Sequence, residues 1–413
     1  MKVLNPPEGE DVADLKQPFP PASTTNAKET RTPVPFPTRN GHALRVLFAV
    51  DSRFPGLGGA ESQALKLALS LREQGVYVEF VTLRVLSSQP LTELYHDFIV
   101  RRIDYPHIRW IGSLVAMYRF AGYLIDNDHR FDAVHIHITH LMAAAAGFAR
   151  ARISLAVTTK VSGFYEFEGG VLDSSRRFKP LNFLIRQGMR KVDFVQTISV
   201  QTREKLLGAG FDDRQIQFVP NGIDSRVSPV DPPSHDIIRV GYCGRLRVVK
   251  GVHVLLNGFA RVKAAYPEQK FLLLLAGIGS EQAALEAQAE SLGIQSDIEW
   301  LGLISDTKPF YRSLHIYVQP SFAEGLPNSV MEAMVAQRPV VASNIGGNTD
   351  LVENEVNGLL FDSGDDAALA DQLSRLIDEP VLNDRLALSG RQSIVERYGL
   401  DSVTRKLAEL YLA

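Results

Sequence analysis

The chain has 413 residues, of which 45% are hydrophobic and 22% charged, and its formal net charge is -3. This length exceeds that of one ordinary core and predicts two domains, while the near-neutral charge argues against a nucleic-acid-binding protein. The single cysteine, Cys243, excludes an internal disulfide and fits a reducing compartment.

Residues 1–40 are rich in proline and polar residues, so we expect them to form a disordered tail. The N-terminus lacks the apolar stretch of a signal peptide, and no apolar run approaches the roughly 18 residues of a membrane span. We therefore expect a cytoplasmic protein that neither spans a membrane nor is secreted by the usual route.

Between residues 41 and 225, β-branched apolar runs alternate with amphipathic helical patterns, which is typical of parallel sheets covered on both faces. Strands are predicted at 44–50, 76–83, 132–138, 155–161 and 194–199. This part is expected to form an N-terminal Rossmann-like domain. It ends in a proline-rich stretch with an Asn-Gly turn at 221–236, which indicates a domain boundary.

The same alternation returns in residues 226–393 and predicts a second, C-terminal Rossmann-like domain. Its strands are predicted at 237–244, 270–277, 298–302, 315–321 and 339–343. Residues 394–413 are expected to form a C-terminal helix, with a predicted break at Gly399. The expected fold class is thus α/β, with two doubly wound domains facing a central cleft. Ligands of such sheets bind at the carboxyl ends of the strands, so we expect the active site in this cleft.

The loop after the first strand contains Gly56, Gly58 and Gly59, which invites comparison with a dinucleotide-binding turn. However, Glu61 stands where that motif requires its third glycine, and the next predicted strand ends without an acid for a ribose. The pattern therefore argues against a nicotinamide cofactor.

Histidines 135, 137 and 140 cluster at the end of the strand at 132–138. Three histidines suggest zinc, but no acid or cysteine stands beside them in the sequence, which argues against a metal. His135 is interpreted as a buried strand residue. Asp126 and Asp128 form a D-x-D pattern that is interpreted as a solvated turn.

Arg245 and Lys250 follow the first strand of the second domain, where two cations can bind a diphosphate. The glycine turn at 276–281 and the helix start at 324–329 follow two other strands of the same sheet. We therefore expect three strand ends to converge on one anion.

Glu324 and Glu332 stand eight residues apart across a loop-to-helix junction, because Pro327 and Asn328 are typical of a helix start. Carboxylates accept hydrogen bonds, and sugar hydroxyls donate them. A first-turn glutamate can also merely complement the helix dipole, but this explains neither Glu324 nor the accompanying cations.

The segments GRLRVVKG, AGIGSE, WLGLIS and PSFAEGLPNSVMEAM resemble, in this order, the donor-binding half of glycosyltransferase family 4, also called glycosyl transferases group 1. These are retaining enzymes of the GT-B fold, and the resemblance covers most of 237–365. It implies that the domain at 41–225 binds the acceptor and that the domain at 226–393 binds the nucleotide-sugar donor. It implies transfer of a sugar, such as a hexose, from a UDP- or GDP-sugar to a glycan or glycolipid acceptor in polysaccharide or cell-envelope biosynthesis. Arg245 and Lys250 would hold the diphosphate, Glu332 the ribose and Glu324 the transferred sugar.

The resemblance also implies further site residues. His137 would contact the sugar or acceptor and, with Glu324, Arg245 and Lys250, is a candidate catalytic residue. Lys160 stands where the family commonly has another histidine. The other donor-binding residues implied are Gly58, Gly59, Glu61, Gly244, Gly277, Gly279, Leu303, Gly325, Leu326, Pro327, Asn328, Ser329 and Glu332.

No cofactor or divalent metal is expected to be obligatory, since the sugar nucleotide is itself a substrate. A sugar-nucleotide epimerase, a phosphorylase and a sugar-nucleotide-binding protein without turnover remain open on the same scaffold. The basic and apolar segment 176–191 is either a solvated helix with one core face or a peripheral contact with the inner face of the membrane. No nucleic acid is expected as a partner.

Overall fold

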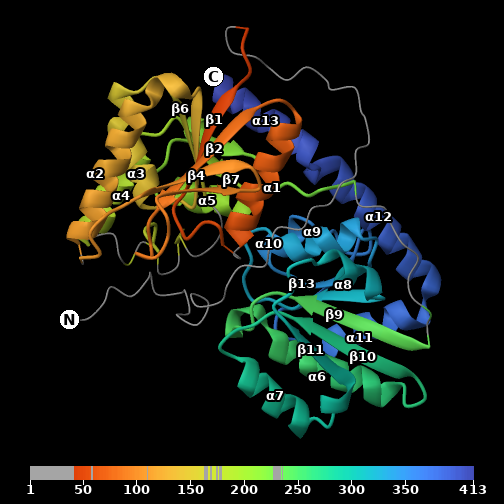
Figure 1. Cartoon of the computed structure of the whole chain (residues 1–413). Coiled ribbons are helices and arrows are strands. Elements are labelled where there is room, and N and C mark those ends of the chain that lie inside the picture. The colour runs from red at the N-terminus through yellow and green to blue at the C-terminus, as the bar shows by residue number, and fades with distance from the viewer. Residues whose placement is uncertain are drawn as a thin grey trace. The chain divides into compact units, whose positions relative to one another are not determined.

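The computed structural model describes residues 41–413 except 57–58, 109, 162–165, 168–169, 174, 176–178, 227–233 and 235. The expected tail at 1–40 therefore lies outside the described residues. The chain divides into two compact units (Figure 1). The first contains Met1–Ile198, Thr202–Gly222 and Leu400–Ala413, and the second contains Ser199–Gln201 and Ile223–Gly399.

The division after Gly222 lies inside the proline-rich stretch, three residues before the expected end of the first domain at 225. At the other end, helix α12 (Pro380–Tyr398) continues through the expected boundary at 393/394. The break falls at Gly399, and only α13 (Leu400–Leu412) belongs to the first unit. Its buried residues recur with the spacing of a one-sided helix and complete the core of that unit.

The first unit is built on an eight-stranded sheet in the order β3-β4-β2-β1-β5-β6-β7-β8. Only the β3–β4 pair is antiparallel. The strands are β1 (Arg45–Val50), β2 (Tyr77–Leu83), β3 (Thr92–Tyr95), β4 (Phe98–Ile103), β5 (Ala133–His137), β6 (Ala156–Lys160), β7 (Phe194–Thr197) and β8 (Ile216–Phe218). The five strands predicted for this domain are confirmed, and β3, β4 and β8 are additional.

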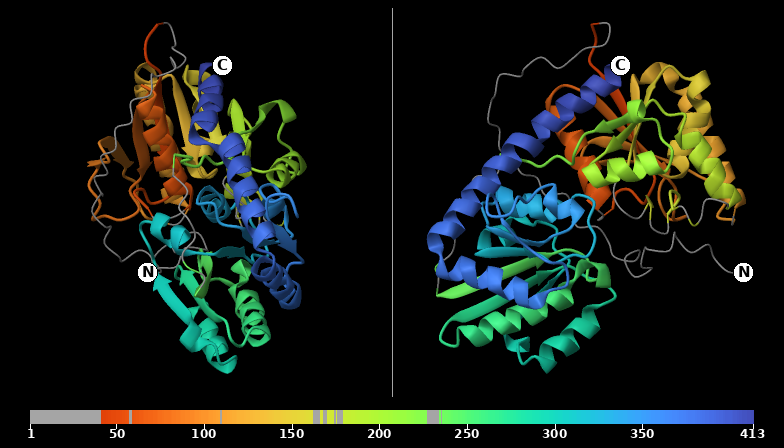
Figure 2. Two further views of the ribbon diagram at one scale, coloured as in Figure 1. Left: turned by 90° about the vertical axis from the view of Figure 1, so that its right-hand side faces the viewer. Right: turned by 180° about the vertical axis from the view of Figure 1, so that it is seen from behind.

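Helices cover both faces of the first sheet. One face packs against α1 (Gly59–Glu73) and α13, which Figure 2 shows in dark blue alongside the sheet. The other face packs against α2 (Ile111–Asp126), α3 (Leu141–Ala149) and α4 (Pro180–Met189), and α5 (Val200–Gly208) contributes Leu206 to the same core. Both sides of each central strand are therefore buried, which explains their nearly continuous apolar sequences.

The second unit is built on a six-stranded sheet in the order β11-β10-β9-β12-β13-β14, with all neighbours parallel. The strands are β9 (Ile237–Cys243), β10 (Lys270–Ala276), β11 (Ile298–Gly302), β12 (Ile316–Gln319), β13 (Val340–Ser343) and β14 (Leu359–Phe361). The five strands predicted here are confirmed, and β14 is additional.

Figure 1 shows helices on both faces of the second sheet, with α6, α7 and α11 on one side and α8, α9 and α10 on the other. The helices are α6 (Val252–Ala265), α7 (Gln282–Ser291), α8 (Lys308–Ser313), α9 (Asn328–Val335), α10 (Gly346–Thr349), α11 (Asp366–Asp378) and α12. Each unit is therefore a doubly wound Rossmann-like domain. Because the strands of the second sheet are parallel, their carboxyl ends lie along one edge.

Candidate functional site

The carboxylate of Glu324 lies at the centre of a hydrogen-bond network at the carboxyl edge of the second sheet. Its Oε1 accepts hydrogen bonds from Lys250 Nζ at 2.6 Å, Ser321 Oγ at 2.7 Å and Gln319 Nε2 at 2.8 Å. The Glu324 side chain is only 9% exposed. Among the described residues, none donates to Oε2. One carboxylate oxygen is thus fixed by the protein, and the other can accept a hydrogen bond from a ligand.

Backbone packing brings Lys250 to Glu324. Lys250 ends a short 3₁₀ turn, and Gly251 follows with a left-handed φ of 66°. A Cβ on Gly251 would lie 2.1 Å from the carbonyl oxygen of Pro320, so only glycine fits there. The Phe322 amide also donates to the Val249 carbonyl at 2.8 Å. The loops after β9 and β12 are therefore joined directly beside the Lys250–Glu324 pair.

Gln319 is held by the residues around it. Its Oε1 accepts from Tyr317 Oη at 2.7 Å and from Ser329 Oγ at 2.9 Å. Burial raises the pKa of Tyr317 well above its usual value, so the phenol stays neutral and can donate. With its oxygen engaged, the Gln319 amide directs its Nε2 toward Ser321 and Glu324.

The predicted glycine turns pack against one another at the ends of β9, β10 and β11. Gly277 has a φ of 143°, and a Cβ on it would lie 1.8 Å from the Gly244 carbonyl oxygen. A Cβ on Gly279 would lie 2.2 Å from the carbonyl oxygen of Leu246. The Gly277 amide donates to the Gly302 carbonyl at 2.7 Å. The structure thus brings these strand ends together, while the anion expected there stays a prediction.

Arg245 lies in the loop after β9 with an exposed side chain. Its carbonyl accepts a hydrogen bond from Tyr242 Oη at 3.0 Å, which fixes the backbone. In the described part of the chain, no acidic side chain pairs with its guanidinium. Leu303, after Gly302, is likewise exposed.

Glu332 lies in the second turn of α9, whose first residue is Asn328, as the sequence predicts. Its Oε2 accepts a hydrogen bond from Thr307 Oγ1 at 3.0 Å. Leu326 and Pro327 are buried, while Gly325, Asn328 and Ser329 are partly exposed. Among the residues that the structure describes, no side chain caps the start of α9. A Cβ on Gly347 would lie 2.4 Å from the Glu324 carbonyl oxygen.

The residues predicted in the first domain lie in a different setting. Gly59 is the first residue of α1, and Glu61 accepts a hydrogen bond from Ser52 Oγ at 2.5 Å. Gly58 lies outside the described residues. His137, the last residue of β5, is completely buried and packs against His135 and Phe48. Ligand contact by His137 therefore requires movement of the atoms that cover it.

Lys160 ends β6 beside His137 in the sheet register. Burial lowers its pKa to about 7, and burial, together with the charges of His135 and Lys160, holds the pKa of His137 well below its usual value. No described residue forms a hydrogen bond to Lys160 Nζ or to either ring nitrogen of His137. At neutral pH the His137 ring is therefore neutral, while the buried Lys160 amine is only partly protonated.

Several polar residues of this network were missed by the sequence analysis. Gln319 and Ser321 appear in the sequence only as the end of an apolar strand, and Thr307 as one polar residue in a loop. A polar residue at the carboxyl end of a parallel strand is the signal that could have identified Gln319. Asp51, at the end of β1, was also missed; it accepts from the Met142 amide at 2.7 Å, and burial raises its pKa.

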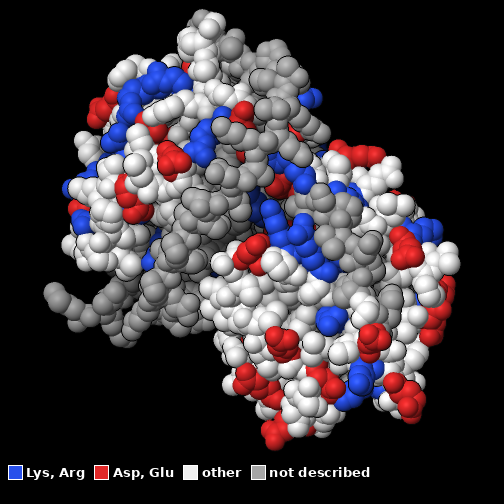
Figure 3. Space-filling view, turned by 45° about the vertical axis from the view of Figure 1, so that its right-hand side comes forward, with Lys and Arg blue, Asp and Glu red and all other residues white. Residues whose placement is uncertain are grey.

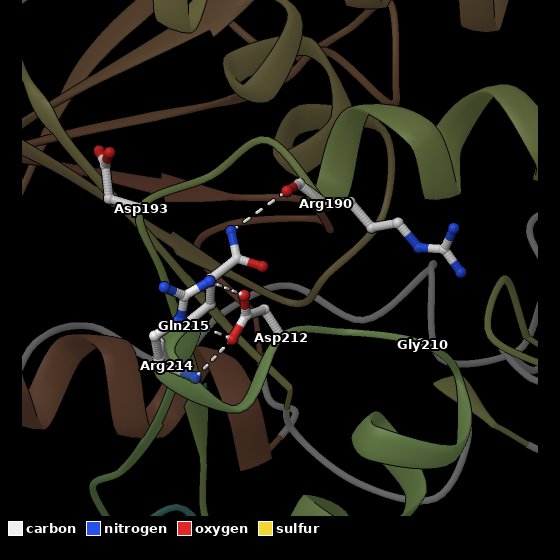
Figure 4. Close-up of a pocket in the computed structure, with 6 residues that line it drawn as sticks. All are labelled: Arg190, Asp193, Gly210, Asp212, Arg214 and Gln215. Atoms are coloured by element: carbon white, nitrogen blue, oxygen red, sulfur yellow. Dashed lines mark hydrogen bonds and ion pairs between the residues drawn. The ribbon is translucent and has the colours of Figure 1, made fainter.

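A surface hollow of about 580 Å³ lies elsewhere, at the amino ends of β7 and β8 in the first unit (Figure 4). Its polar side chains bond one another, since Arg214 donates to Asp212 at 2.6 Å. It is lined by Arg190, Asp193, Gly210, Asp212, Arg214 and Gln215. None of these residues is a predicted site residue, and ligands of doubly wound sheets bind at the opposite edge.

Two further searches concern metals and membranes. Within the described ranges, His, Cys, Asp and Glu side chains form no group of three or more that could hold a metal ion. Across that same part of the chain, no helix combines the length and apolar character that a membrane crossing requires. The face drawn in Figure 3 carries Lys and Arg as well as Asp and Glu, with the two signs interspersed.

Two protein-family models match the chain: a glycosyl transferase 4-like domain over residues 58–222, and glycosyl transferases group 1 over residues 238–379. The chain is similar to the capsular polysaccharide biosynthesis glycosyltransferase CapM of Staphylococcus aureus, with 23% identity over 61% of this chain and 66% of that protein. It is also similar to D-inositol 3-phosphate glycosyltransferase of Xylanimonas cellulosilytica, with 25% identity over 86% of this chain and 91% of that protein.

Among solved structures, the HepE protein of Anabaena in complex with UDP matches with a TM-score of 0.71. The two are 21% identical, and the match covers 89% of this chain and 99% of that one. At this identity the match shows a shared fold.

Proposed function

Because the chain is a glycosyltransferase of the GT-B fold, with a 4-like domain followed by a group 1 domain, we propose that it transfers a hexosyl group from a nucleotide-diphosphate sugar with retention of configuration. The observation that carries this proposal is the Lys250–Glu324 pair at 2.6 Å, within the carboxyl edge of the second sheet. A cation beside a carboxylate that has one oxygen left to accept a hydrogen bond suits a ligand that carries both phosphate and hydroxyl groups.

Each residue of the site then has a distinct role. Lys250 and Arg245 bind the diphosphate and stabilise the charge that develops on it as the sugar departs. Glu324 uses Oε2 to accept a hydrogen bond from the transferred sugar, and Glu332 binds the ribose hydroxyls. The amino-terminal end of α9 faces the phosphates.

The proposed transfer proceeds on the face of the leaving group. Oε1 of Glu324 already accepts three hydrogen bonds, and the proposal assigns Oε2 to a sugar hydroxyl, so neither oxygen is left to attack the anomeric carbon. A donor phosphate oxygen therefore helps to remove the proton of the acceptor hydroxyl, so no divalent metal is required. Assays with excess chelator should retain full activity.

The proposed donor is a UDP-sugar and the acceptor a glycan or glycolipid of polysaccharide biosynthesis. Support comes from the UDP complex of the similar HepE structure and from the capsular polysaccharide role of the similar CapM. The protein would then act in the cytoplasm, with the segment 176–191 as a peripheral membrane contact. Product analysis with and without acceptor separates transfer from epimerisation.

Thermal unfolding with UDP, GDP, ADP and NAD tests the donor site directly. One nucleoside diphosphate at 100 times its Kd is expected to stabilise the protein by about 2.7 kcal/mol. The shift should disappear in Glu332→Ala, because that variant lacks the carboxylate that binds the ribose. Stabilisation by NAD alone, or by none of the four, would contradict the proposed donor site.

Thr307→Val is expected to weaken binding of the same nucleotide by roughly 5-fold, the equivalent of one hydrogen bond of about 1 kcal/mol. Thr307 orients Glu332 through the 3.0 Å hydrogen bond, while valine preserves the side-chain shape. Isothermal titration calorimetry measures the change, and Thr349→Val on α10 provides a control with a hydroxyl bonded only to its own helix. Equal affinity of Thr307→Val and the unaltered protein would show that Thr307 does not orient Glu332 for binding.

A further inference from the structure

Two basic side chains lie together at the carboxyl edge of the first sheet. His137 and Lys160 are the last residues of β5 and β6, and they stand opposite each other in the sheet register. Register partners of neighbouring strands point to the same face, so both side chains lie on one side of the sheet. We call them the β5–β6 basic pair. Ligands of doubly wound sheets bind at this edge, so the pair lies where a substrate is expected.

The nitrogen atoms of the pair have no partners in the described part of the chain. This holds for Lys160 Nζ and for both ring nitrogens of His137. Lys160 is 2% exposed and His137 is 0% exposed, and buried polar groups of folded proteins are nearly always hydrogen-bonded. His135 stacks on His137, with ring centroids 4.4 Å apart, and brings no negative charge either. A group that satisfies these nitrogens must therefore supply acceptor atoms.

The backbone holds the pair in a fixed position. Thr139, just after β5, donates from Oγ1 to the Lys160 carbonyl at 2.6 Å, which ties the ends of the two strands together. Ile138, between His137 and Thr139, has a φ of 68°, a conformation that a β-branched residue rarely adopts. Such strain persists only where the surrounding structure enforces it, and it clusters at functional sites. The strand ends are thus held in one geometry before any ligand arrives.

A lysine at this position lowers the stability of the fold. Burial disfavours the charged amine and lowers its pKa to about 7, and no described carboxylate pairs with the amine to offset this effect. Residues that reduce stability without a structural role are typical of functional sites. Water can accept a hydrogen bond from the amine but cannot neutralise its charge. A carboxylate or a phosphate does both.

We propose that the β5–β6 basic pair binds a carboxylate or phosphate group of the acceptor. Lys160 supplies the positive charge, and the neutral His137 ring supplies one N–H donor. Because the pair is buried, the atoms that cover it must move as the anionic group enters. The inference rests on the proposed function, in which the first domain binds the acceptor, and it adds that this acceptor is anionic.

Carbon-13 NMR of protein labelled at the lysine ε carbons tests the anion site without donor or acceptor. The signal of Lys160 is the one that Lys160→Met lacks. Inorganic phosphate binds the charged amine, so it should raise the pKa of Lys160 from about 7 by at least about one unit. Acetate is the second probe, and the more effective of the two anions identifies the group as phosphate or carboxylate. No response to either anion, or an equal response to potassium chloride of the same ionic strength, would overturn the proposal.

Two variants separate the pair from the rest of the domain. His137→Phe keeps a ring but loses the N–H donor, so the affinity for the more effective anion should fall by roughly 5-fold. Lys191→Met removes an exposed lysine of the same domain and should leave the Lys160 response unchanged. Thermal unfolding checks that each variant is folded. Equal anion affinity for His137→Phe and the unaltered protein would overturn the pair as the binding unit.

Inhibition kinetics show which substrate carries the anionic group. Phosphate can also bind at Lys250 in the second domain, so the informative part of its inhibition is the part that Lys160→Met removes. That part should be competitive with the acceptor. Competition with the donor instead would assign the anion to the donor sugar and overturn the proposal.

The test is separate from the test of the donor site. Stabilisation by UDP without a Lys160 response to phosphate or acetate would overturn this inference and leave the proposed function in place. A Lys160 response without stabilisation by any nucleoside diphosphate would support the anion site and contradict the proposed donor site.

Discussion

Replacing Lys250 by Ala is expected to lower kcat by about 10²- to 10³-fold, while the KM for the donor changes far less. The charge on the leaving diphosphate grows as the glycosidic bond breaks, so a fixed cation stabilises the transition state more than the bound substrate. Lys250 is fixed by Glu324 and is only 20% exposed, which strengthens its electrostatic effect. Steady-state kinetics with varied donor measures both constants.

A matched control is Lys263→Ala in α6 of the same domain. Lys263 pairs with Asp297 away from the carboxyl edge, so its loss should leave both kinetic constants unchanged. Nucleotide binding by the Lys250 variant, measured by calorimetry, shows whether its donor site is still formed. Equal kcat values for Lys250→Ala and the unaltered protein would show that Lys250 does not stabilise the transition state and serves only as a structural partner of Glu324.

Lys160→Met is expected to stabilise the first domain at pH 7 by an amount on the order of 4 kcal/mol. Lys160 is 2% exposed, and burial lowers its pKa from 10.5 to about 7. Its folded-state pKa therefore lies below its unfolded-state pKa. Between these values the unfolded chain holds more protons, so the stability of the native protein rises as pH rises from about 7 to 10.5.

The pH dependence distinguishes this charge effect from improved packing. The native protein should gain up to about 1.4 kcal/mol per pH unit within that window, and Lys160→Met should lose this slope. His135, whose pKa burial lowers to about 3, gives a slope of the same sign at lower pH, between about 3 and its usual value of 6.5. Loss of the slope above pH 7 therefore reports on Lys160.

Urea unfolding measured through Trp110 in a Trp300→Phe background reports on the first domain alone. Lys191→Met is the control, since Lys191 is exposed on the same domain and should keep the native pH slope. Parallel pH profiles for the Lys160 variant and the unaltered protein would show that the Lys160 amine is hydrated or paired in solution.

The sequence pattern identified ten strands because most of them are apolar runs buried on both faces, although β11, at a sheet edge, is only partly buried. It missed the β3–β4 hairpin, whose turn residues His96 and Asp97 have φ values of 48° and 63°. Asn-Gly is the usual pair for two consecutive positive φ angles, and His-Asp carries no comparable signal. The edge strands β8 and β14 have three residues each, which is too short for a period of two to appear.

The site residues also divide into those that the sequence pattern shows and those whose role depends on the packing of the fold. Glu324, Glu332 and Lys250 could be predicted because they stand beside strand ends and a helix start and match the motifs of the resembled family. Gln319 and Ser321 were missed because their importance depends on which oxygen they reach, and this depends on the packing of two loops. The burial of Lys160 also depends on its neighbours in the sheet, so its sequence context showed only a strand ending in a lysine.

The return of α13 to the first domain has a consequence for how the protein is made. During synthesis, residues 45–222 leave the ribosome early, but the helix that buries Phe48 and His135 through Tyr411 is translated after the whole second domain. The second domain is continuous from 223 to 399 and can fold first. While residues 223–399 are being synthesised, the nascent first domain therefore exposes the apolar sheet face that α13 later covers. Chaperones have their longest opportunity to bind that face during this time.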